Sequence, residues 1–197
     1  MRYFFIAQKV KNSPLMIIIF LVICIRFATK CDFSLLEKDA QLIESLTKLK
    51  LDSDKNDLKV VAFSNGPRKY VLKVLDVLGL SDVFPSECVY AIDDTLPYCK
   101  PEKEAFQKIL SNISDEGDAI QFEECVMVED SMKNVQAAKS LGMKTILITG
   151  SNIESHHDID RPDVNDPAVD VCLSNANQIQ SAVPGLWECP ATFRRSA

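Results

Sequence analysis

The stretch CVMVEDSMKN at residues 125–134 decides the fold, because an apolar run ends there in two adjacent acids. The run Cys125–Val128 is short and uncharged, which is typical of a strand buried on both faces of a parallel sheet. After the two acids, apolar residues recur at helical spacing as far as Gly142, so a helix is expected directly after the strand. A strand that leads into a helix is the repeating unit of an α/β protein.

The same unit recurs on both sides of this stretch. Leu58–Phe63 is predicted to be a buried strand, and it follows a helix whose apolar residues run from Leu35 to Leu49. Further strands are expected at Cys88–Ile92, Thr145–Ile148 and Val169–Leu173, the last at a sheet edge. Helices are expected at residues 67–78, 101–110 and 178–183, with polar loops or turns at 52–57, 93–100, 111–124 and 150–168. The pattern predicts a parallel sheet with flanking helices.

Length and charge limit the possible classes of function. With 197 residues, 47% of them hydrophobic, the chain can bury one core and is too short for two ordinary domains. The net charge is -6, but residues 1–30 contain five basic residues and no acid, which leaves -11 for residues 31–197. An acidic body argues against nonspecific nucleic-acid binding, which needs a basic surface.

The seven cysteines favour reduced thiols over a disulfide framework or a zinc site, because they are odd in number, widely spaced and without a CxxC pair. Cys88, Cys125 and Cys172 lie in or at the start of apolar runs. There a thiol is expected to act as a small core hydrophobe.

The apolar run Leu15–Ile25 is preceded by basic residues and leaves three interpretations open. It is a targeting or anchor segment, a buried strand of the core, or a sequence unrelated to the rest. As a helix it would span roughly 16 Å, about half of a membrane's hydrocarbon core. We therefore separate residues 1–33 from a core at 34–188 and a tail at 189–197. The expected location is cytoplasmic, or membrane-associated or secretory if the run is an anchor or a signal.

Polar residues after the apolar runs are the candidate site, because open α/β sheets bind ligands beyond the carboxyl ends of their strands. Ser64 and Asn65 offer a hydroxyl and a backbone N–H to phosphate oxygens, and Lys100 offers a positive charge. Glu129 and Asp130 are oxygen ligands of the kind that suits Mg²⁺. Each residue alone also fits an ordinary role, as a helix cap, a surface lysine or a helix-start acid.

The order of these residues resembles a known family. Residues 60–66, 99–102 and 126–134 resemble motifs II, III and IV of the haloacid dehalogenase-like (HAD) hydrolase superfamily. Residues 64–84 and 183–188 are similar to its pyrimidine 5′-nucleotidase-like branch. The resemblance covers residues 34–188 and implies a Rossmann-like core that is incomplete on its N-terminal side.

The resemblance implies a role for each candidate residue. Ser64 and the Asn65 amide would hold the phosphoryl group, Lys100 would neutralise it, and Asp130 would ligate Mg²⁺, with Glu129 acting through water or sharing the metal. The implied cofactor is Mg²⁺, and the implied partner is a small phosphorylated metabolite such as a nucleoside monophosphate. Nucleic acid is not an expected partner, and membrane contact is expected only if residues 15–25 form an anchor or a signal.

The nucleophile of the family is not found in this sequence. Such enzymes attack phosphorus with an aspartate in a D-x-D-x-T loop that follows the first strand and precedes a cap domain. Residues 1–63 show no such motif after an apolar strand, so motif I and the cap are expected to be missing. Residues 52–54 have the D-x-D spacing, but they lie too close to Ser64 for a parallel crossover and read as a solvated turn. Asp32 lacks the second aspartate and the threonine.

The predicted function is therefore that of a HAD-like phosphohydrolase that is impaired or inactive as this chain. One alternative is a non-catalytic fragment or a protein that binds phosphate or Mg²⁺. A second alternative, a membrane-anchored interaction protein, depends on residues 15–25 alone.

Overall fold

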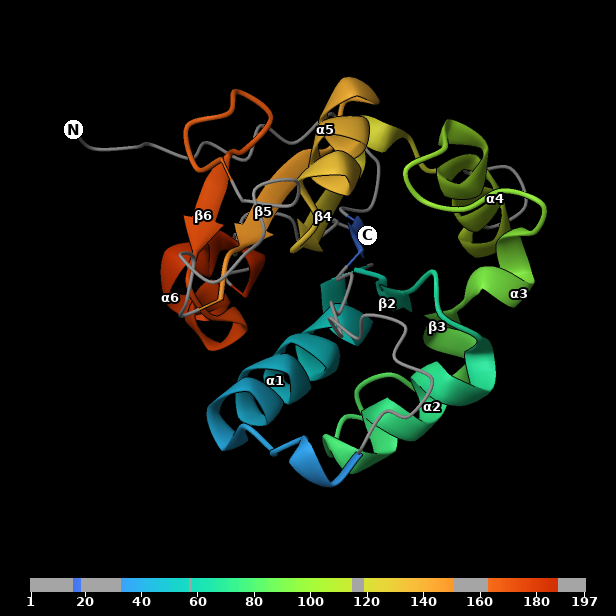
Figure 1. Ribbon diagram of the computed structural model, residues 1–197. Coiled ribbons are helices and arrows are strands. Elements are labelled where there is room, and N and C mark those ends of the chain that lie inside the picture. Colours follow the sequence, from blue (N-terminus) through green and yellow to red (C-terminus); the bar gives the residue numbers. More distant parts are fainter. Residues whose placement is uncertain (1–15, 19–32, 57, 115–118, 151–162, 188–197) are drawn as a thin grey trace, which may run out of the picture.

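A computed structural model of the chain describes residues 16–18, 33–56, 58–114, 119–150 and 163–187. Six strands form one sheet in the order β3-β2-β1-β4-β5-β6, and every neighbouring pair is parallel (Figure 1). The strands are β1 (Met16–Ile18), β2 (Val60–Phe63), β3 (Val89–Tyr90), β4 (Cys125–Glu129), β5 (Lys144–Ile148) and β6 (Val171–Leu173). The predicted α/β class with a parallel sheet is confirmed.

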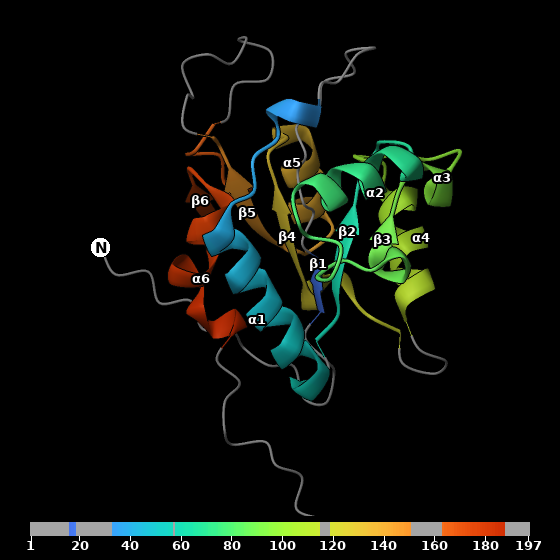
Figure 2. The same ribbon diagram turned by 90° about the horizontal axis from the view of Figure 1, so that it is seen from below.

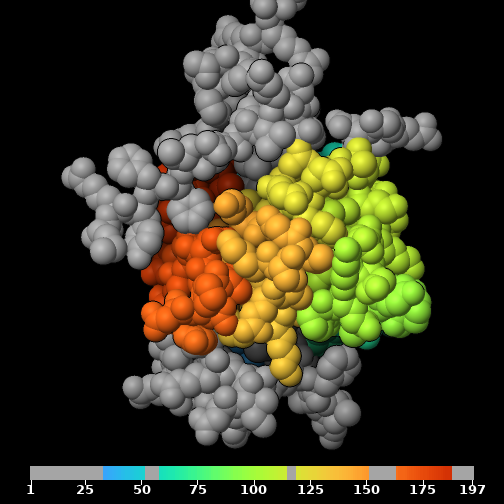
Figure 3. All heavy atoms as spheres, turned by 90° about the horizontal axis from the view of Figure 1, so that it is seen from above, coloured from blue at the N-terminus to red at the C-terminus, as the bar shows by residue number. Residues whose placement is uncertain are grey.

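Helices cover both faces of the sheet. The helices are α1 (Ala40–Asn56), α2 (Arg68–Val77), α3 (Ile92–Thr95), α4 (Lys103–Ile113), α5 (Met132–Ser140) and α6 (Ile179–Ala182). In Figure 1, α4 and α5 lie above the sheet, and α1 and α2 lie below it. Figure 3 looks onto the upper layer and shows α5 between α4 and the segment 163–173. Flanking helices on two faces explain why β2 and β4 are buried throughout.

Successive side chains of strand β2 pack into the hydrophobic cores on opposite faces of the sheet. Val60 and Ala62 belong to the core under α1 and α2, while Val61 and Phe63 belong to the core under α4 and α5. The Phe63 ring meets Phe106 of α4 edge to face, with 6.1 Å between the ring centroids. This two-sided burial accounts for the continuous apolar run that predicted the strand.

Strand β1 lies in the middle of the sheet, between β2 and β4 (Figure 2). Ile17 pairs with Val60 on one side and with Val126 on the other. Met16–Ile18 thus form a strand of the sheet, while the rest of the apolar run Leu15–Ile25 lies outside the described residues. Within the described part of the chain, no helix is both long and apolar enough to cross a membrane.

Helix α1 corrects the prediction of a turn at residues 52–57. The helix continues through Asp52, Ser53 and Asp54 to Asn56. Leu46 and Leu49 are fully buried against the sheet, and this packing sustains a helix beyond the point where local polarity suggested its end. The D-x-D spacing thus belongs to a helix end and not to a loop after a strand, which agrees with its rejection as the nucleophile motif.

Three smaller differences also have local causes. The strand predicted at residues 88–92 is limited to Val89–Tyr90, because the Asp94 carboxylate accepts a hydrogen bond from the Ala91 N–H (2.7 Å) and caps α3 inside the predicted loop. Helix α4 starts at Lys103 and extends into the predicted loop at 111–124, where Ile113 is buried. Cys125 is buried as expected and Cys88 half-buried, but Cys172 is exposed because β6 is an edge strand.

The position of β1 predicts a strong effect of proline. Ile17→Pro should lower the melting temperature by roughly 5 °C or more, because a strand paired on both sides loses a ladder hydrogen bond at any proline. Ile17→Val keeps the backbone donor and should stay within roughly 2 °C of the wild type. Thermal unfolding followed by circular dichroism measures both, and equal stability of the two variants would contradict a central β1.

The packing of α1 predicts a contrast between two leucines on the same helix. Leu49 has no exposed side-chain area, whereas Leu51 is 61% exposed. Leu49→Ala should therefore cost about 2–5 kcal/mol in the free energy of unfolding, and Leu51→Ala less than about 0.5 kcal/mol. Denaturant titration of the two variants tests this, and similar losses would contradict the burial of Leu49 against the sheet.

Candidate functional site

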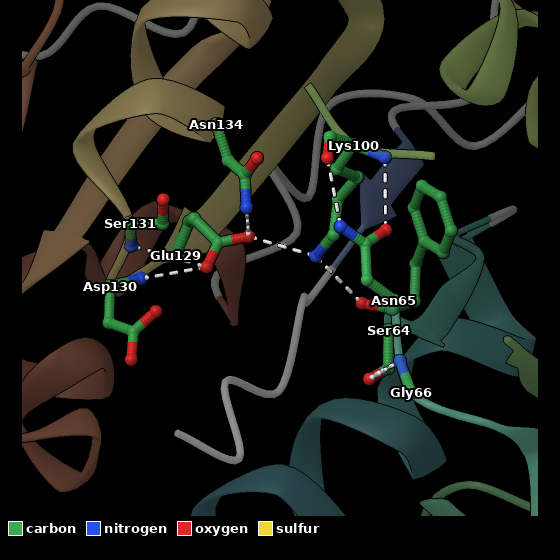
Figure 4. A network of polar contacts seen from close by, with 9 residues as sticks. Ser64, Asn65, Gly66, Lys100, Glu129, Asp130, Ser131 and Asn134 are labelled. Carbon is green, nitrogen blue, oxygen red and sulfur yellow. Dashed lines mark hydrogen bonds and ion pairs between the residues drawn. The ribbon is translucent and has the colours of Figure 1, made fainter. Parts of the chain in front are cut away.

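The predicted site residues meet at the carboxyl edge of the sheet. Ser64 directly follows β2, Glu129 ends β4, and the segment between α3 and α4 brings Lys100 between them (Figure 4). Strand β1 lies between β2 and β4, so the site spans three adjacent strands. Ser64 and Glu129, which are 65 positions apart in the sequence, are thereby brought to the same edge of the sheet.

A buried ion pair lies at the centre of the site. The Lys100 Nζ atom is 2.9 Å from Glu129 Oε2, and the two side chains are only 6% and 3% exposed. The ammonium also donates to the Phe63 carbonyl oxygen at 3.0 Å and lies 5.0 Å from the centre of the Phe63 ring. A charged lysine is tolerated in this interior because it has a carboxylate, a carbonyl and a π face around it.

The Glu129 carboxylate accepts four hydrogen bonds. Its Oε2 atom accepts from Lys100 Nζ (2.9 Å) and Asn134 Nδ2 (3.0 Å). Its Oε1 atom accepts from the backbone N–H groups of Asp130 (3.1 Å) and Ser131 (3.3 Å). An ionised carboxylate offers about four lone-pair positions, so these donors use its whole accepting capacity.

The protonation of Glu129 follows from its surroundings. Burial by itself raises the pKa of this carboxyl group, but the Lys100 ammonium and the hydrogen bonds from Asp130 and Lys100 outweigh burial and hold the pKa below its usual range. Glu129 is therefore a carboxylate at neutral pH, and the ion pair with Lys100 is a true charge pair.

Asn65 positions Lys100 through the backbone. Its side-chain Nδ2 donates to the Lys100 carbonyl oxygen at 2.8 Å, and its Oδ1 accepts from the Lys100 N–H at 2.9 Å. The paired bonds fix the segment after α3 to the end of β2. The sequence predicted only the backbone N–H of Asn65 as a functional group, and the structure adds this side-chain role.

Ser64 lies at the turn between β2 and α2. Its Oγ atom accepts a hydrogen bond from the Gly66 N–H at 3.0 Å, while its own N–H donates to the Tyr90 carbonyl oxygen at 2.9 Å. A hydroxyl that accepts from the backbone retains its proton for donation. The half-buried Ser64 hydroxyl is thus oriented by the turn and can donate to an anion at the sheet edge.

Asp130 and Asn134 differ in how well the sequence revealed them. Figure 4 shows the Asp130 carboxylate pointing away from Lys100, while the Asp130 side chain is hydrogen-bonded to Glu129. Asn134, in the first turn of α5, donates to Glu129 but was not singled out from the sequence. A polar residue one helical turn after a strand-end acid was the available signal, and it becomes specific only when the strand and the helix have been placed.

The ion pair predicts that loss of Lys100 reverses the pH dependence of Glu129. In the wild type the Glu129 pKa is depressed, so its contribution to stability is present above the usual value near 4.5 and is lost as the pH falls through the folded value. In Lys100→Met the ammonium no longer offsets burial, so that pKa should rise although the hydrogen bonds from Asp130, Ser131 and Asn134 remain, and the buried charge should cost about 3–5 kcal/mol at pH 7.

The stability difference between wild type and Lys100→Met should therefore shrink as the pH falls from about 7 to about 4, because protonation removes the buried charge of the variant. Denaturant titrations at several pH values measure it. Lys103→Met, at an exposed lysine nearby, should change the stability by less than about 0.5 kcal/mol at each pH. A difference that is independent of pH would contradict the ionised state of Glu129.

Comparison with known proteins identifies the family and the fold of the chain. Residues 32–142 match the family model of the haloacid dehalogenase-like hydrolases. Among solved structures, a HAD family hydrolase from Deinococcus radiodurans with bound phosphate and sodium is 19% identical, with a TM-score of 0.57 over 78% of this chain and 62% of that chain. A Thermotoga maritima protein assigned as a β-phosphoglucomutase is 22% identical, with a TM-score of 0.54 over 78% and 62%.

A HAD-hydrolase from Bacillus subtilis bound to magnesium is 18% identical, with a TM-score of 0.50 over 71% of this chain and 55% of that chain. At such identities the structural likeness shows the fold. This chain spans between 55% and 62% of the length of these three proteins. The match of the family model extends over more than half of the sequence. The chain belongs to the haloacid dehalogenase-like hydrolase family.

Proposed function

We propose that the chain is a HAD-type phosphate-binding domain, similar to pyrimidine 5′-nucleotidases, that hydrolyses phosphate monoesters weakly or not at all. In this proposal the Ser64 hydroxyl and the Asn65 backbone N–H hold phosphoryl oxygens, and Lys100 supplies the positive charge. Support comes from the place of these residues at one carboxyl edge of a parallel sheet, where α/β proteins bind their ligands.

One observation supports the expectation that hydrolysis is weak or absent. Strand β1 lies between β2 and β4, the place that the family gives to the strand before its aspartate nucleophile. Residues 19–31, which follow this strand, contain no aspartate and no glutamate. Loss of a catalytic nucleophile lowers a turnover rate by about a millionfold, so hydrolysis is not expected to be measurable.

The Mg²⁺ ion predicted with Asp130 and Glu129 finds a poor set of ligands. Magnesium takes oxygen ligands with open lone pairs in a near-octahedral arrangement. Four N–H donors already use the lone pairs of Glu129. Among the described residues there is no group of three or more acidic, histidine or cysteine side chains that could hold a metal ion. The donor set therefore does not fit a magnesium site.

The proposed ligand is a small phosphorylated metabolite, and a nucleoside monophosphate is the class implied by the resemblance of residues 64–84 and 183–188. The second of these segments has a structural role: the Trp187 indole N–H donates to the Ser45 carbonyl oxygen at 2.9 Å and ties the segment to α1. The contact holds the end of the described core in place, and the choice of phosphate ester depends on binding measurements.

The proposal predicts binding without turnover. Purified protein incubated with a panel of phosphate monoesters and Mg²⁺ should release no more phosphate than Asp130→Ala does. Inorganic phosphate should bind, and Ser64→Ala should weaken it by about tenfold because a hydrogen bond to a charged group is lost. Ser131→Ala is the matched control and should bind normally, since only the Ser131 backbone contacts the site.

Isothermal titration calorimetry and a phosphate-release assay make these measurements. Turnover by the wild type that disappears in Asp130→Ala would overturn the impaired activity. Failure of the wild type to bind phosphate would overturn the binding function.

A further inference from the structure

The charge balance of the site determines whether a metal ion can enter it. To ligate a cation, Glu129 would have to release at least one of its four N–H donors. The two backbone donors at Oε1 belong to the residues that begin the turn into α5, so they move only with the backbone. The donors at Oε2 are the Asn134 amide and the Lys100 ammonium.

Displacement of Lys100 is opposed from three sides. Asn65 holds its backbone with two hydrogen bonds, the Phe63 carbonyl accepts from its ammonium, and burial removes the solvent that would stabilise a displaced charge. A divalent cation bound to Glu129 would lie only a few ångströms from the Lys100 ammonium. The two positive charges would repel each other strongly there, because the dielectric constant of the protein interior is low. The lysine therefore occupies the electrostatic place of a metal ion.

We infer that this site binds an oxyanion of the phosphate class without a divalent metal, with Lys100 as its built-in cation and Glu129 as the counter-ion of that lysine. The inference rests on the proposed phosphate-binding function and specifies how the site does it. Glu129 then opposes phosphate binding, because its negative charge lies 2.9 Å from the ammonium and cancels much of its field. The affinity of the wild type for phosphate is correspondingly modest.

This arrangement and a metal-bridged site predict opposite effects of one substitution. If Glu129 held a metal that bridges to phosphate, Glu129→Gln would weaken phosphate binding. With Glu129 as a counter-ion, Glu129→Gln removes an opposing charge and should tighten phosphate binding by about tenfold. Asp130→Asn makes the same change of charge one residue further on, where the carboxylate points away from Lys100 (Figure 4), and should tighten binding less.

The experiment titrates the full chain with three probes by calorimetry. MgCl₂ alone should give no saturable heat, and inorganic phosphate should bind with the same dissociation constant, within about twofold, in EDTA and in excess MgCl₂. Phosphate is then titrated into Glu129→Gln and Asp130→Asn. Saturable Mg²⁺ binding, phosphate binding that requires Mg²⁺, or weaker binding by Glu129→Gln would each overturn the inference.

Two outcomes separate this inference from the proposed function. If the wild type binds neither Mg²⁺ nor phosphate, the phosphate-binding function fails, and with it the assignment of Lys100 as the cation of that site. If phosphate binds only with Mg²⁺, the function stands and the metal-free site is wrong. Glutamine places an N–H₂ group against N–H donors, so thermal unfolding must show that Glu129→Gln is folded. If it is not, the wild-type titrations with MgCl₂ and phosphate decide.

Discussion

The buried ion pair between Lys100 and Glu129 is the constraint on which the rest of the site depends. Removing either partner leaves a buried charge without compensation, so each must be held where the other can reach it. Three separate parts of the chain do this: the end of β2 through Asn65 and Phe63, the end of β4, and the first turn of α5 through Asn134. The pair thus couples the ends of two strands and the start of a helix into one structural unit.

In the proposed function, the same pair separates phosphate binding from catalysis. Folds host many functions, and activity depends on the groups that the fold presents. Here the fold presents an oriented hydroxyl at Ser64 and a lysine, while the carboxylate beside them is consumed by internal hydrogen bonds. A site of this kind has the polarity of a phosphate-binding site and no reactive carboxylate among its described members that is both central and open to a ligand.

Local sequence was sufficient wherever one short segment determined the outcome. β2, β4 and β5 were predicted because two-sided burial produces apolar runs, and the predicted site residues Ser64, Lys100 and Glu129 do come together. The turn predicted at residues 52–57 from their polarity was wrong, because the packing of Leu46 and Leu49 extends α1 as far as Asn56. The apolar run at 15–25 fits a signal, an anchor and a strand equally well. The two hydrogen bonds between the Asn65 side chain and the Lys100 backbone could not be predicted, because they join two segments that are distant in the sequence.

The position of β1 has a consequence for the order of assembly. It is the first strand in the chain, yet its neighbours are Val60 and Val126, so the sheet closes only after most of the sequence has been made. Contacts of such long sequence separation delay folding because the intervening chain must lose its freedom first. Until β4 is made, the edge of β1 that later pairs with β4 lacks its partner, and unpaired strand edges favour association with other chains. Strand β1 therefore controls when the nascent protein stops being prone to aggregation.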